Sequence, residues 1–246
     1  MAPLLSPAEV GEKIVEWHSC IITRDLEQAH TLKEEVDQKV NRMKADDKML
    51  SYYQLISYRH DILTETIHEE SSLPAIDDSQ TSTDDYLRFM YYYVSGQSEF
   101  FHGRYKSAIR LYVIAERLLE NVNDAAEKAE FYERIGISYY YMDQYSTAAS
   151  YVEQALTFFE KQESYIEREI NCKSLLAAIE TELERYESAD LIYEELLVSS
   201  RPYPITHGHI LRNMGLNRMS QGKFLEAASF SKNHWKWKST ATRLME

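Results

Sequence analysis

The chain has 246 residues, of which 44% are hydrophobic and 12% aromatic, enough for a sizeable core in one large or two modest domains. Its net charge of −13 argues against nonspecific binding to nucleic acid or to an anionic membrane. Seven glycines and five prolines are few, which favours long helices over a sandwich of short strands.

Several classes of protein are disfavoured by what the sequence does not contain. No apolar run approaches the roughly 18 residues that span a bilayer, and the start of the chain does not have the pattern of a signal peptide. Cys20 and Cys172 have neither disulfide-framework nor metal-ligand spacing, so we interpret them as reduced thiols. These observations predict a cytoplasmic protein.

A bundle of three amphipathic helices is predicted at the start of the chain. Ser6 is placed as an N-cap, Pro7 as the first helical residue and Glu9 as the partner that closes a capping box. Short turns between the helices favour an antiparallel three-helix bundle over residues 1–70. The apolar stripes predict helices over residues 6–22, 25–43 and 46–68.

A polar linker is expected at 71–83, followed by helical repeats over 84–232. The repeats are recognised from small residues that recur about 40 positions apart. In the best-formed copies an aromatic residue lies three positions before the small residue and another lies four positions after it. Another small residue lies twelve positions before each of them, on the predicted partner helix. The pairs are Gly96 and Ala108, Gly136 and Ala148, Ala177 and Ala189, and Gly215 and Ala227.

The predicted fold class is therefore all-α: the bundle followed by a solenoid of helical hairpins similar to tetratricopeptide repeats, although that repeat has a period of about 34. After Ala228 the pattern fails, and residues 233–246 form an atypical tail that alternates aromatic and basic residues. The tail is either an improvised cap or sequence read out of frame after a truncation, and we favour truncation.

No catalytic motif of a hydrolase, nucleotide-binding protein or zinc enzyme is present. His207 and His209 are the only close histidine pair, in what we expect to be a turn between repeats, and no further metal ligands are placed near them. Asp46 and Asp47 precede a predicted helix, where carboxylates commonly cap free N–H groups. We expect no cofactor or metal in this chain.

Four segments carry a resemblance to a known family. They are Val10 to Trp17, Met43 to His60, the repeat start Tyr105-Lys-Ser-Ala-Ile, and Glu127-Lys-Ala-Glu-Phe131. They resemble the Rap family of spore-forming Gram-positive bacteria, which comprises response-regulator aspartate phosphatases and binding-only relatives. The resemblance covers residues 4 to about 230. It implies that the bundle binds a response regulator and that a short signalling peptide binds the repeats and moves the bundle against them.

The resemblance also assigns roles to individual residues. In phosphatase members a Gln is thought to orient the water that hydrolyses the partner's phospho-aspartate, and that position here is Asp47. An extra carboxylate beside a phosphoryl group is electrostatically unfavourable. Leu50 and Tyr58 match contacts to the response regulator, whereas Glu182 and Asn213 match the peptide groove. Ile179 replaces a groove Asn.

Three hypotheses follow. In the leading one, the chain is a Rap-type regulator that promotes dephosphorylation of a response regulator under peptide control, and the partner supplies the Mg²⁺. In the second, the chain is a binding-only anti-activator because Asp47 replaces the Gln. In the third, it is a truncated repeat scaffold without a regulator partner.

Overall fold

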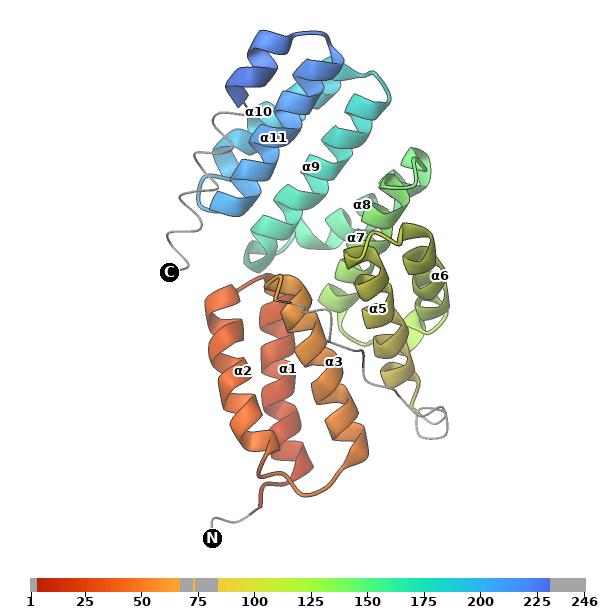
Figure 1. Cartoon of the computed structure of the whole chain (residues 1–246), viewed down its shortest axis with the longest axis vertical. Coiled ribbons are helices and arrows are strands. Elements are labelled where there is room, and N and C mark those ends of the chain that lie inside the picture. The colour runs from red at the N-terminus through yellow and green to blue at the C-terminus, as the bar shows by residue number, and fades with distance from the viewer. Residues whose placement is uncertain (1–3, 67–72, 74–83, 231–246) are drawn as a thin grey trace. The chain divides into compact units, whose positions relative to one another are not determined.

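The computed structural model of the chain describes residues 4–66, 73 and 84–230 (Figure 1). The regular secondary structure of these residues is helical, apart from one isolated β-bridge between Leu5 and Met43. The all-α prediction is confirmed. Most of the predicted linker and all of the predicted tail lie outside the described residues.

The structure divides into two compact units, Met1–Ser138 and Tyr139–Glu246. The boundary at Ser138 lies within the repeats and not in the predicted linker. The first unit therefore contains both the predicted bundle and the first repeat helices, which makes contacts between them part of one folded body.

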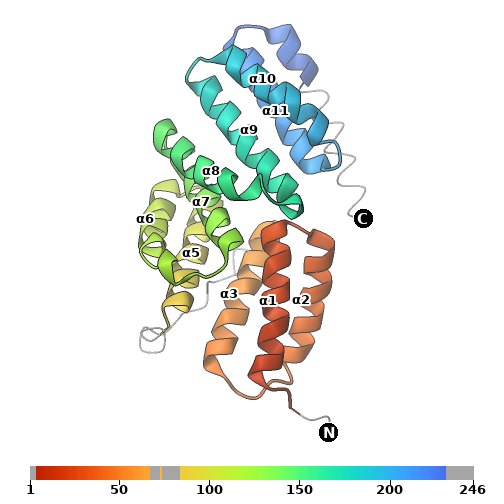
Figure 2. The same cartoon turned by 180° about the vertical axis from the view of Figure 1, so that it is seen from behind.

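The bundle consists of α1 (Pro7–Thr23), α2 (Leu26–Val40) and α3 (Asp47–Leu63). In Figures 1 and 2 the helix α1 lies between the other two. Its predicted capping box is present: Ser6 Oγ accepts from the Glu9 amide, and Glu9 Oε2 accepts from the Ser6 amide. The apolar stripes meet in a core that contains Val10, Ile14, Trp17, Leu32 and Leu55.

The predicted end of the third helix near His68 is wrong, because α3 ends at Leu63. The Thr64 backbone N–H and hydroxyl both donate to the His60 carbonyl at this end of the helix. Glu65 then has a φ of 56°, a left-handed conformation that cannot continue the helix.

The first unit continues with α5 (Asp85–Phe101), α6 (Tyr105–Glu116), the 3₁₀ turn Leu119–Asn121 and α7 (Ala125–Tyr140), whose last two residues belong to the second unit. Ala108 is fully buried, as the repeat pattern predicts. Its partner Gly96 lies so close to Tyr112 that a Cβ there would be 2.4 Å from the ring. The small residue thus permits the aromatic four positions after Ala108 to fill the helix crossing.

The second unit repeats this arrangement. It contains α8 (Tyr145–Phe159), α9 (Ile166–Glu182), α10 (Tyr186–Ser199), α11 (Pro204–Ser220) and helical residues 224–230. The small residues Ala177 and Ala189 are buried in one core with Tyr193, Leu196 and Met214. None of the helices in the described part of the chain is long and apolar enough to cross a membrane.

His207 is not in a turn, as predicted, but in the first turn of α11. Pro204 is the first residue of that helix, a position that tolerates proline because its N–H would have no helical partner. The His207 side chain is buried, and its Nδ1 lies 2.7 Å from Ser200 Oγ. This histidine is therefore a structural link between α10 and α11.

Gly96→Ala should lower the free energy of unfolding by about 1–3 kcal/mol, because the new methyl group would collide with the buried Tyr112 ring. The loss should occur although alanine is about 1 kcal/mol better than glycine inside a helix. Urea unfolding followed by circular dichroism measures it. Gly11→Ala is the matched control, since its nearest neighbour is the flexible end of Met49. Equal stability of the two variants would contradict the tight crossing.

Candidate functional site

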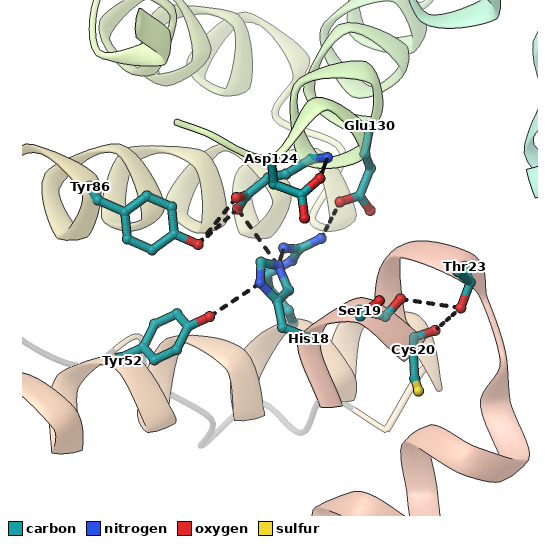
Figure 3. A network of polar contacts seen from close by, with 10 residues as sticks. His18, Ser19, Cys20, Thr23, Tyr52, Tyr86, Asp124 and Glu130 are labelled. Carbon is teal, nitrogen blue, oxygen red and sulfur yellow. Dashed lines mark hydrogen bonds and ion pairs between the residues drawn. The ribbon is translucent and has the colours of Figure 1, made fainter. Parts of the chain in front are cut away.

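A buried polar network joins the bundle to the first repeat helices within the first unit (Figure 3). Its centre is Arg59 on α3, whose side chain is 1% exposed. Arg59 Nη2 donates to Glu130 on α7, and Nη1 donates to His18 on α1. The guanidinium also lies 5.1 Å from the centre of the Tyr93 ring on α5. We call the set His18, Tyr52, Arg59, Tyr86, Glu127 and Glu130 the Arg59 network.

The groups around Arg59 stabilise its positive charge. Burial alone would lower its pKa, but Glu130, Tyr93 and Glu127 outweigh burial and raise the pKa above its usual value. A guanidinium can only donate hydrogen bonds. Three helices, α1, α5 and α7, thus contribute an acceptor, an aromatic face and a counter-charge to one buried cation on α3.

The contacts of His18 determine which of its nitrogens carries the proton. Nε2 must accept, because Arg59 donates to it, so the proton lies on Nδ1, 3.3 Å from the Tyr52 hydroxyl. Burial and the neighbouring Arg59 charge hold the pKa of His18 well below its usual value. His18 is therefore neutral, and its 3.7 Å approach to Glu127 is not an ion pair.

Glu127 is the acidic group of this network that is not matched by a cation of its own. It is 2% exposed and accepts a hydrogen bond from the Tyr86 hydroxyl at 3.1 Å. Burial raises its pKa to about 7, against the opposing effect of Arg59. Near neutral pH Glu127 is therefore about half protonated, whereas His18 is neutral and keeps only its Nδ1 proton.

The network was not predicted from the sequence, although one signal for it exists. Ala126, Glu130, Glu133 and Gly136 follow helical spacing along α7, and the two glutamates on this stripe are buried. A charged residue on an apolar stripe indicates a buried partner. The partner itself could not be identified, since Arg59 lies 71 positions earlier.

The residues predicted to contact a response regulator are separated by the fold. Asp47 is exposed in the first turn of α3, next to Asp46, which caps the helix by accepting from the Met49 amide. Leu50 is 39% exposed one turn later. Tyr58 is only 5% exposed, and its hydroxyl lies 2.7 Å from Ser98 Oγ on α5. A partner could reach Asp47 and Leu50 directly, but Tyr58 only after α3 moves away from α5.

The residues predicted for the peptide groove both lie in the second unit. Glu182, at the end of α9, is exposed and accepts from the hydroxyls of Tyr140 and Tyr145. Asn213 on α11 is partly buried, and its Nδ2 donates to Ser174 Oγ at 3.3 Å.

A second asparagine, Asn217, lies one turn after Asn213 and was not predicted. It is fully buried, donates to Asp190 Oδ1 at 2.7 Å and accepts from the Thr181 hydroxyl. Its amide therefore links α9, α10 and α11.

Comparison with known proteins is consistent with this architecture. Residues 4–65 match the family model of response regulator aspartate phosphatase H, N terminal. The chain is 32% identical to response regulator aspartate phosphatase E of Bacillus subtilis (strain 168) over 214 residues, 84% of this chain and 57% of that protein. A solved Rap protein complexed with competence and sporulation factor has a TM-score of 0.84 at 27% identity, over 95% of this chain and 66% of that one.

The chain is also similar to part of a protein that is named as a methyltransferase. Type II methyltransferase M.CeqI of Rhodococcus hoagii is 47% identical over 235 residues, 94% of this chain but 45% of that protein. The chain spans about half the length of the curated relatives it matches. A similarity that covers less than half of the methyltransferase does not bring its activity to this chain.

Arg59→Met should lower the free energy of unfolding by about 3–5 kcal/mol, because Glu130 would be left buried without its cation. The double variant Arg59→Met/Glu130→Met should recover much of this loss, since no charge is then stranded. Urea unfolding at pH 7 measures both. Arg104→Met is the control: Arg104 is 53% exposed in its pair with Glu99, so its loss should lower the stability much less than the loss of Arg59. A double variant no more stable than Arg59→Met would contradict the role assigned to the pair.

Glu127→Gln should become increasingly more stable than the wild type as the pH rises from 4.5 to 7. In this window folded Glu127, with its pKa of about 7, keeps a proton that the unfolded chain releases, so wild-type stability falls. The difference should grow by about 3 kcal/mol across the window. His18, with its lowered pKa, makes both proteins more stable as the pH rises and cancels in the comparison. A difference that does not vary with pH in urea unfolding would contradict the assignment.

Proposed function

The chain belongs to the Rap family, and from this premise we propose that it binds a response regulator through the start of α3 in a manner controlled by a short peptide. The observation that carries the proposal is the exposed turn of Asp47 and Leu50, on a bundle whose residues 4–65 match the family's N-terminal model. Leu50 offers an apolar contact of the kind found at the centre of protein interfaces.

Peptide control is supported by relatives and by the second unit. The similar Rap structure is a complex with competence and sporulation factor. In this chain Glu182 and Asn213 present an exposed carboxylate and a partly buried amide, groups that can accept from and donate to a peptide. Ile179 is 3% exposed, so it contributes to the core rather than to a polar groove.

Asp47 favours a binding-only form of this function. An amide can donate to and accept from a water molecule without bringing charge, whereas an ionised carboxylate can only accept. A carboxylate also adds negative charge beside a phosphoryl group, which is unfavourable at short range. Exposed Asp47 is therefore a poor group for positioning the water that attacks a phospho-aspartate. The partner's Mg²⁺ would be the metal in such a complex, with none supplied by this chain.

Asp47→Gln should accelerate phosphate release from the bound response regulator by about tenfold or more, an effect within the range of one well-placed polar group. The experiment uses a panel of purified response regulators phosphorylated with acetyl phosphate. It measures complex formation and phosphate release for the wild type and the variant. We expect the wild type to bind one member and leave its rate of hydrolysis near the uncatalysed value.

Two further variants test the docking surface. Leu50→Ala should weaken the complex about tenfold, whereas Leu191→Ala, an equally conservative change at a leucine 71% exposed in the second unit, should not. Wild-type acceleration of hydrolysis would favour the phosphatase hypothesis over the binding-only one. Failure to bind any phosphorylated or unphosphorylated member would overturn both.

A further inference from the structure

The first unit contains a cavity of about 570 Å³ beside the Arg59 network. It is bounded by α1 and α3 of the bundle, the start of α5, and the segment that leads into α7. Pockets for small molecules generally have volumes of about 300–1,000 Å³. The cavity is therefore large enough for a small organic ligand. Lys48 and Met49, between Asp47 and Leu50 on α3, line it, whereas Glu182 and Asn213 of the predicted peptide groove do not.

The lining of the cavity combines apolar walls with acidic groups. Val15, Ile22, Met49 and Leu87 supply apolar surface. Three carboxylates, those of Asp84, Asp124 and Glu127, line it against one lysine, Lys48. An excess of negative charge next to apolar walls suits a cation with an apolar body.

Two of the three carboxylates have structural roles that explain their presence. Asp84 caps α5 by accepting from the Tyr86 and Leu87 amides, and it pairs with Lys48. Asp124 accepts from the Ala126 amide at 2.7 Å and from the Glu127 amide at 3.2 Å, at the start of α7.

Glu127 is different, because it does not cap a helix. It is buried at the inner end of the cavity, and the cation that acts on it, Arg59, is already paired with Glu130.

Two tyrosines flank Glu127 in the lining of the cavity. In Figure 3 the Tyr52 hydroxyl is directed toward His18, and the Tyr86 hydroxyl donates to the Glu127 carboxylate. The two tyrosine rings lie 6.1 Å apart and are tilted, and both line the cavity. Aromatic faces attract organic cations, which adds to the attraction of the carboxylate.

We propose that this cavity binds a small organic cation, an amine or guanidine with an apolar body, whose charge lies against the Glu127 carboxylate. Its apolar part lies along Val15, Met49 and Leu87, and the tyrosine rings flank the charge. Such a ligand contacts the bundle and the repeat helices at once. Binding therefore stabilises the arrangement in which they are packed together.

Binding should depend on pH because Glu127 must be ionised to hold a cation. Its pKa of about 7 predicts affinity about tenfold higher at pH 8 than at pH 6, where about nine-tenths of this carboxyl is protonated. An aliphatic amine stays charged throughout this range. The groups that face Glu127 are His18 from α1, Tyr52 and Arg59 from α3, Tyr86 from α5, and Asp124 and Glu130 near its own helix.

Among the groups around Glu127 that have shifted pKa values, none of the others titrates between pH 6 and pH 8. The pKa of His18 is held well below its usual value, whereas the pKa of Arg59, Tyr52 and Tyr86 is raised above the usual value.

Isothermal titration of the full chain with 2-phenylethylamine and with the neutral analogue 2-phenylethanol tests the proposal at pH 6 and pH 8. We expect saturable binding of the amine at pH 8, about tenfold tighter than the alcohol and about tenfold tighter than at pH 6. Absence of saturable amine binding, or equal affinity for the amine and the alcohol, would overturn the proposal.

Three variants assign the binding to this cavity. Glu127→Gln should reduce amine affinity to that of the alcohol and remove the pH dependence. Glu120→Gln, which removes an exposed carboxylate on the 3₁₀ turn outside the lining, should leave both unchanged. Val15→Trp should weaken amine and alcohol alike by about tenfold, because Val15 is 57% exposed at the mouth and a larger side chain fills it without disturbing the core. Unchanged amine binding by Glu127→Gln and Val15→Trp would place the site elsewhere and refute the proposal.

Discussion

Arg59 carries a full charge inside the first unit, and the surrounding helices are arranged to accommodate it. A buried guanidinium is costly unless its charge and its donors are matched. Here Glu130 supplies the counter-charge, His18 an acceptor and Tyr93 an aromatic face, each from a different helix. The bundle and the first repeats therefore share one electrostatic centre, which explains why they form one compact unit although a linker separates them in the chain.

This centre connects the two surfaces to which function is assigned. Arg59 follows directly after Tyr58, whose hydroxyl meets Ser98 on α5, and both lie on the helix that begins with Asp47. The cavity shares His18, Tyr52, Tyr86 and Glu127 with the Arg59 network. Separating α3 from α5 would expose Tyr58 to a partner, but it would also remove Arg59 from the Tyr93 ring and open the cavity. Exposure of Tyr58 is thus coupled to the loss of a buried contact of Arg59.

Much of the fold could be predicted from the sequence, because its signals are local or periodic. The capping box at Ser6 and Glu9 lies within four residues, and Ala108 and Gly96 belong to a repeated pattern. The end of α3 was predicted too late because neither glycine nor proline follows Leu63 until Pro74, so no residue type marks the end of the helix. For the candidate site, the structure leaves Asp47 and Leu50 exposed but covers Tyr58, and the Arg59 network was not predicted. Its partners lie 41 and 71 positions from Arg59, and no local pattern encodes that pairing.

The sequence by itself determined the helices, the repeat, the resemblance to the Rap family and the presence of Asp47 in place of the family's Gln. Each of these depends on residue identity at short or regular spacing. Only the tertiary structure decided which side chains are dehydrated. Tyr58 is covered by α5, and the pKa of Glu127 is raised to about 7 because the helices around it exclude water. Desolvation depends on every neighbour at once, and so the chemistry of a buried group is a property of the fold.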